Sequence, residues 1–114
     1  MILGFVLTGN GAKTLLIRAV GPSLVDYKVT GWLEDPVLTI YQGSNPILTV
    51  DDWGDAPDPS ALAATMNSAG AFPLVAGSTD AAVVVSLMPG LYTALARGKG
   101  TSTGKVLVEV YAPE

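Results

Sequence analysis

The sequence contains no cysteine and no histidine. Without cysteine the chain can form neither disulfides nor thiolate metal sites, and it has no thiol nucleophile. Without histidine it lacks the usual general base, the common zinc ligand and any Ser-His-Asp catalytic triad. These two absences exclude many kinds of catalysis, and we expect a protein that is not an enzyme.

Charge is also scarce, because only 14% of the residues are charged and the net charge is −4. The six basic residues are mostly scattered, so they form no basic stripe of the kind that nucleic-acid binding requires. No apolar run approaches the roughly 20 residues of a membrane span. The first residues contain no basic segment followed by an apolar run, as a signal peptide would. We therefore expect a domain that does not bind nucleic acid and that is either cytosolic or a mature or excised piece of a secreted protein.

Hydrophobic residues are abundant at 49%, which predicts a well-buried core. A chain of 114 residues has room for one domain, so we assign residues 1–114 to a single unit. The 13 glycines and 8 prolines indicate many turns, and many turns imply short strands.

Seven segments are rich in β-forming residues and are bounded by glycine, proline or asparagine. They are 2–8, 14–20, 36–42, 47–50, 81–88, 91–97 and 105–111. One short helix is predicted around 59-68, with Asp58 as its N-cap, Pro59 in its first turn and Gly70 at its end. Because helices and strands do not alternate, we predict an all-β fold, an antiparallel β-sandwich of about seven strands.

Local turn signals predict which strands pair. Asn10-Gly11 predicts a hairpin between the first two strands. A four-residue turn at 43–46 predicts a second hairpin, and Pro89-Gly90 and the loop 98–104 predict two more near the end of the chain.

Several long segments resemble one bacterial domain family. They are "GFVLTGNGAKTLLIRAVGPSL", "LEDPVLTIY", "DDW" and "DAAVVVSLMPGLYTALARGKGTSTGKVLVEVY", in that order. The chain is similar to a repeat or accessory domain of large secreted and cell-surface proteins of Verrucomicrobia and related bacteria. It is also distantly similar to the pre-peptidase C-terminal β-sandwich module. The resemblance implies a secreted β-sandwich module, and it does not point to any known catalytic activity. This chain has "DDWGDAPD" and "LMPG" where the family often has "NDNW" and "LPPG".

The loop 51–58 concentrates four aspartates. Asp51, Asp52 and Asp55 are hard oxygen ligands in a segment that contains glycine, as a Ca²⁺ site requires, although their spacing is not that of an EF-hand. In the alternative interpretation Asp58 caps the helix and the other aspartates turn the chain or face water. A pair of carboxylates for glycoside hydrolysis is disfavoured, because one loop is a poor scaffold for holding two groups at a set separation.

Two charged residues lie inside apolar strands, Arg18 in "LLIRAVG" and Glu109 in "VLVEVYA". A buried charge without a partner is costly. These side chains therefore either point to solvent on an exposed face or meet polar partners. The candidate partners of Arg18 are Asp35, Glu109 and nearby carbonyl groups, and we predict a structural role.

Trp32 and Trp53 lie beside irregular backbone. Exposed indoles can stack on sugars, but we predict that both anchor loops to the core, since an indole buries a large area.

These observations lead to one expected function and one alternative. We expect a structural or adhesion module of a cell-surface protein, in contact with other domains or with copies of itself through edge strands that few charges protect. The alternative is an accessory module that binds calcium or carbohydrate through the loop 51–58.

Overall fold

The computed structural model describes residues 1–112 and places seven strands in two sheets. The strands are β1 (Ile2–Leu7), β2 (Lys13–Val20), β3 (Pro36–Gln42), β4 (Asn45–Val50), β5 (Ala81–Leu87), β6 (Gly90–Gly98) and β7 (Leu107–Tyr111). The α-helix is α1 (Pro59–Ser68), and two short 3-10 helices are η1 (Pro22–Tyr27) and η2 (Trp53–Asp55). The fold is an antiparallel β-sandwich with one short helix, as predicted.

The strand order is β1-β6-β3-β4 in one sheet and β5-β2-β7 in the other. Among the described strands, only β3 and β4 form a hairpin within one sheet. The other three predicted hairpins are wrong, because Asn10-Gly11, Pro89-Gly90 and the loop 98–104 each carry the chain from one sheet to the other. A turn signal shows that the chain reverses, but it does not show whether the returning strand lies beside the first strand or across the core.

The main core lies between the two sheets. The buried side chains of this core include Leu15, Ile17, Leu38, Ile40, Tyr92 and Ala94. Phe5 of β1 stacks on Tyr92, with ring centroids 5.6 Å apart. The Tyr92 hydroxyl donates to the carbonyl oxygen of Met88 at 2.7 Å, so this buried ring keeps a hydrogen bond.

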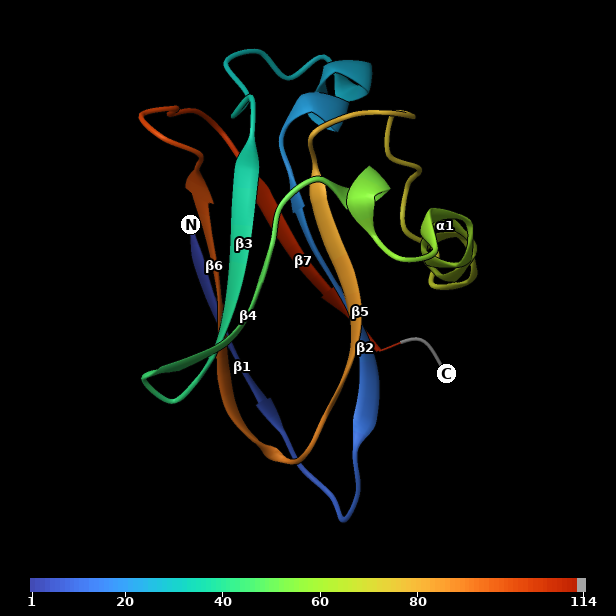
Figure 1. Cartoon of the computed structure of the whole chain (residues 1–114), viewed down its shortest axis with the longest axis vertical. Helices are drawn as coiled ribbons and strands as arrows, with labels where there is room; N and C mark the ends of the chain where they lie inside the picture. Colours follow the sequence, from blue (N-terminus) through green and yellow to red (C-terminus); the bar gives the residue numbers. More distant parts are fainter. Residues whose placement is uncertain (113–114) are drawn as a thin grey trace.

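A second apolar cluster covers the outer side of the three-stranded sheet. Leu16 and Val20 of β2 pack there with Leu62 and Met66 of α1. Figure 1 shows α1 on the side of β5 and β2, away from β1 and β6.

Helix α1 begins and ends with capping hydrogen bonds. The Asp58 side chain accepts a hydrogen bond from the Ala61 N–H at 3.0 Å, as the sequence predicts for an N-cap. At the other end Gly70 has a φ of 79°, and the Ala71 N–H donates to the Met66 carbonyl. This left-handed glycine and its bonds form a Schellman motif, which ends the helix.

The four-stranded sheet has no helix on its outer side among the described residues. Strand register places Ile2 opposite Leu95 and Val6 opposite Leu91, so these apolar side chains share that outer side. Ile2 is 67% exposed, Val6 is 64% exposed and Leu91 is 60% exposed. We call this group, Ile2, Val6, Leu91 and Leu95, the bare face.

Candidate functional site

The acidic loop begins where β4 ends, and the hairpin register explains which residues meet there. Leu38 of β3 pairs with Val50 of β4, so the residues just before β3 lie beside those just after β4. Asp35 precedes β3, and Asp51 and Asp52 follow β4. Their carboxyl groups come together, each with an oxygen within 4.8 Å of the other two. We call Asp35, Asp51 and Asp52 the acidic triad.

The triad differs from the predicted metal-ligand set in one member. Asp55 lies at the end of η2 and is exposed, outside the triad, while Asp35 takes its place. Asp35 comes from a segment distant in sequence, and strand pairing brings it to the loop. Three carboxylates at this separation are a set of hard oxygen ligands that could hold a metal ion such as Ca²⁺.

Lys99 supplies a positive charge beside the triad. Its ammonium lies 2.9 Å from Asp51 Oδ2, and its backbone N–H donates to the Asp35 carbonyl at 2.9 Å. The hydrogen bond to Asp51, together with the charge of that carboxylate, raises the pKa of Lys99. Because 62% of the Lys99 side chain is exposed, this ion pair contributes little to stability.

The three carboxyl groups have different pKa values. Burial, together with a hydrogen bond to Asp51 and the charge of that carboxylate, raises the pKa of Asp35 to about 6. Burial alone would raise the pKa of Asp51 as well, but hydrogen bonds from Lys99 and Asp35 outweigh it and lower that pKa. Burial and the Asp51 charge raise the pKa of Asp52. One proton is therefore held mainly on Asp35 when the solution is mildly acidic.

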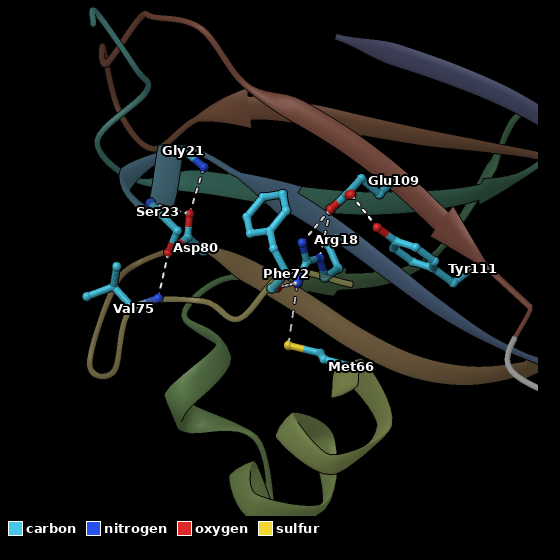
Figure 2. Close-up of polar contacts among 9 residues, drawn as sticks. All are labelled: Arg18, Gly21, Ser23, Met66, Phe72, Val75, Asp80, Glu109 and Tyr111. Atoms are coloured by element: carbon cyan, nitrogen blue, oxygen red, sulfur yellow. Dashed lines mark hydrogen bonds and ion pairs between the residues drawn. The ribbon is translucent and has the colours of Figure 1, made fainter. Parts of the chain in front are cut away.

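Of the candidate partners, Arg18 contacts Glu109 and a backbone carbonyl, whereas Asp35 lies in the acidic triad. Arg18 is completely buried, and its Nε donates to Glu109 Oε1 at 2.8 Å (Figure 2). Its Nη2 lies 2.6 Å from the same oxygen, as an ion pair. Nη1 donates to the Phe72 carbonyl at 2.7 Å, and the guanidinium lies over the Phe72 ring, 4.6 Å from its centroid.

These contacts give Arg18 a structural role. Glu109 also accepts a hydrogen bond from the Tyr111 hydroxyl. Burial and the bond to Glu109 raise the pKa of Tyr111. Arg18 therefore ties β7 to the segment that follows α1, through one buried charge.

Sequence reasoning missed a second buried polar centre, Asp80. Its carboxylate accepts hydrogen bonds from the backbone N–H groups of Gly21 and Ser23, at 2.7 and 3.2 Å, and from the hydroxyls of Ser23 and Ser78 (Figure 2 draws part of this network). Ser23 in turn accepts from the Val75 N–H at 2.7 Å. The "GPS" segment thus has a structural explanation, because it folds around this carboxylate.

Gly21 is required by close approach of the backbone. A Cβ at this position would lie 2.1 Å from the Leu33 carbonyl oxygen, so no larger residue fits without moving the chain. The signal for Asp80 was present as a lone acidic residue directly before the apolar run 81–85, but the sequence does not indicate its partners.

Both tryptophans are partly buried and pack against the cluster beneath α1. Trp53 Nε1 donates to the Ser78 hydroxyl at 3.1 Å, which connects η2 to the Asp80 network. Trp32 forms a parallel bridge with Lys105. These contacts favour the predicted anchoring role over an exposed platform for sugar rings.

Comparison with known proteins does not place the chain in a family. No family model, curated protein or solved structure gives a match. Within residues 1–112, no helix has the length and apolar character needed to cross a membrane.

Proposed function

We propose that this domain is a non-enzymatic structural or adhesion module of an extracellular or cell-surface protein, which associates with copies of itself through β1. The observation that carries the proposal is the free edge of β1 beside the bare face. The sequence resemblance to accessory domains of secreted and cell-surface proteins supports the proposed location.

The backbone groups of β1 alternate between the sheet and the free edge. Met1 and Ala96 exchange hydrogen bonds in both directions, at 3.1 and 2.9 Å, so they form a hydrogen-bonded antiparallel pair. The alternation of such pairs means that Leu3, Phe5 and Leu7 direct their N–H and C=O groups towards β6. The same groups of Ile2, Gly4 and Val6 point away from the sheet.

A second copy offers the matching set of groups. Two β1 strands can pair antiparallel about a two-fold axis at Gly4, which sets Ile2 of each copy opposite Val6 of the other. The pairing would join two four-stranded sheets into one and bury the most exposed part of the bare face at the junction. No charged side chain or proline lies in residues 2–8 to oppose this contact.

Sedimentation velocity over a wide range of protein concentrations tests this proposal. We expect the wild type to form a dimer whose fraction grows with concentration. Gly4→Pro removes an outward N–H without removing a bond to β6, and Val6→Lys adds a charge to the edge, so both variants should be monomeric. Val25→Lys is the matched control, because Val25 is 52% exposed on η1 and should leave the dimer intact.

Circular dichroism of each variant verifies that the sheets remain folded. A wild type that is monomeric at every concentration would refute the proposal. So would a folded Val6→Lys variant that still forms the dimer.

A second candidate function, calcium binding, rests on the acidic triad. We propose that Asp35, Asp51 and Asp52 bind Ca²⁺ weakly, in the millimolar range typical of extracellular modules. Calcium should raise the melting temperature of the wild type and should have no effect on Asp35→Asn. Asp55→Asn should keep the response, since Asp55 is outside the triad. The absence of a shift at millimolar calcium would eliminate this function.

A further inference from the structure

A groove of about 490 Å³ lies between the acidic loop, α1 and β5. Val50 and the loop 51–58 form one wall, Ala61, Leu62 and Thr65 of α1 form the second, and residues 82–84 of β5 form the third. It opens at the side of the sandwich where β4 and β5, the edge strands of the two sheets, lie next to each other.

The groove runs along the free edge of β5. Side chains of consecutive strand residues point to opposite faces of a sheet. Ala82, Val83 and Val84 all line the groove, and three consecutive residues can do so only where the wall is the edge of the strand. Since β2 pairs with β5 on its other side, the edge in the groove is the unpaired one.

Apolar and acidic groups are segregated within the groove. Leu62, Ala82 and Val84 provide apolar surface, and the acidic loop contributes Asp52 and Asp55 among its carboxylates. The described lining residues include no lysine or arginine. A ligand that fits must therefore combine an apolar stem with a positive charge at its end.

The carboxylates of the groove are able to take a further cation. Asp51 already binds the Lys99 ammonium at 2.9 Å, which shows that an alkyl ammonium fits against this loop. Asp55 also lines the groove, is exposed and forms no ion pair among the described residues. Its carboxylate is therefore accessible to a cationic donor in the groove.

We infer that this groove binds a lysine or arginine side chain on an extended segment of a partner protein. The alkyl stem would lie on Leu62 and Val84, and the charged head would reach Asp52 and Asp55. The partner's backbone would add a strand to the free edge of β5, which a small free amine cannot do. The inference does not use β1, so it is independent of the proposed self-association. It shares Asp52 with the acidic triad, and Asp55, which lines the groove outside the triad, distinguishes it from the proposed calcium site.

Binding is tested with two synthetic peptides of alternating valine and threonine. One has lysine at its centre, and the other has norleucine, which keeps the stem and lacks the charge. Fluorescence anisotropy is measured with the Val6→Lys protein, in which self-association through β1 is blocked. We expect the lysine peptide to bind about tenfold more tightly than the norleucine peptide, the effect of one charge-assisted hydrogen bond, and to weaken as salt is added.

Matched aspartate variants locate the contact. Asp55→Asn, which changes a lining carboxylate that caps no helix, should lower the affinity for the lysine peptide about tenfold. Asp35→Asn removes a neighbouring charge that does not line the groove and should leave the affinity unchanged. Ala61→Phe fills the groove from α1 and should prevent binding of both peptides.

Four results would overturn the inference. The first is that the lysine peptide does not bind at millimolar concentration, and the second is that the two peptides bind with equal affinity. The third is that Asp35→Asn loses binding while Asp55→Asn retains it. The fourth is that equimolar n-butylamine displaces the peptide. The third result would show that the lysine ammonium binds at the acidic triad, and the fourth would show that the groove binds small amines.

Discussion

The buried pair of Arg18 and Glu109 allows a quantitative prediction about stability. Glu109→Leu would leave the guanidinium, which is completely buried, without its counter-charge. Removal of one partner from a buried pair costs about 3–5 kcal/mol. The Glu109 side chain is 16% exposed, so some solvent screening applies and we expect a loss of about 3 kcal/mol in the free energy of unfolding.

Arg18→Met should cost less. It removes the bond to the Phe72 carbonyl and the contact with the Phe72 ring, about 1 kcal/mol each. Glu109 keeps the Tyr111 hydroxyl as a donor and can be hydrated at its exposed side. We therefore expect a loss of about 2 kcal/mol for this variant.

The double variant decides whether the two residues act as a pair. It contains no unpaired buried charge, so its loss should be about 2 kcal/mol, whereas the sum of the single losses is about 5. Urea unfolding followed by tryptophan fluorescence measures all three values. If the losses add to within about 0.5 kcal/mol, Glu109 does not hold Arg18 and the reasoning is refuted.

Three further predictions concern the carboxylates and Tyr111. Asp80→Asn should lower the free energy of unfolding, measured by urea unfolding, by about 2–3 kcal/mol, because its amide NH₂ would face N–H groups that now donate to the carboxylate. A change below about 0.5 kcal/mol would show that the network is dispensable. The Asp35 pKa of about 6 lies above its ordinary 3.8, so the folded state binds the proton more tightly than the unfolded state does. The contribution of Asp35 to the free energy of unfolding is therefore largest below pH 3.8 and declines as the pH rises through about 6. Unfolding measured from pH 4 to 7 should show that Asp35→Asn lacks this decline, and an identical pH profile in the variant would contradict the assignment. Ultraviolet titration should show a lower pKa for Tyr111 in Glu109→Gln, since the acceptor loses its charge, and an unchanged value would contradict the role of Glu109.

The strands were predictable because the residues at their ends determine where each strand begins and ends. Prolines and glycines bound segments such as 36–42, and that prediction matches β3 residue for residue. The pairing of the strands was less predictable, since β1 pairs with β6 rather than with β2. The sequence from Thr8 to Ala12 contains a hairpin signal, but the chain there passes around the end of the core to the other sheet.

The candidate site was predictable only in part, because contacts between distant segments depend on strand pairing, which the local sequence does not show. Asp51 and Asp52 stand out as neighbours in the sequence, whereas Asp35 joins them only through the register of β3 and β4. Asp80 lies alone in the sequence and acquires its donors from "GPS", far away along the chain. Glu109 was one of three candidate partners of Arg18, because a buried charge inside an apolar strand needs a polar partner, and the register of β2 and β7 decides among them.

The placement of the first and last strands has a mechanical consequence. β1 pairs with β6 over six residues and β7 pairs with β2 over five, and the two ladders lie in different sheets. In Figure 1 β1 runs downward from the N-terminal end, and β7 also runs downward towards the C-terminal end. A force that pulls these ends apart therefore reaches the core through two separate ladders, one in each sheet. A module under tension would have to lose the β1–β6 or the β7–β2 ladder before its core opened.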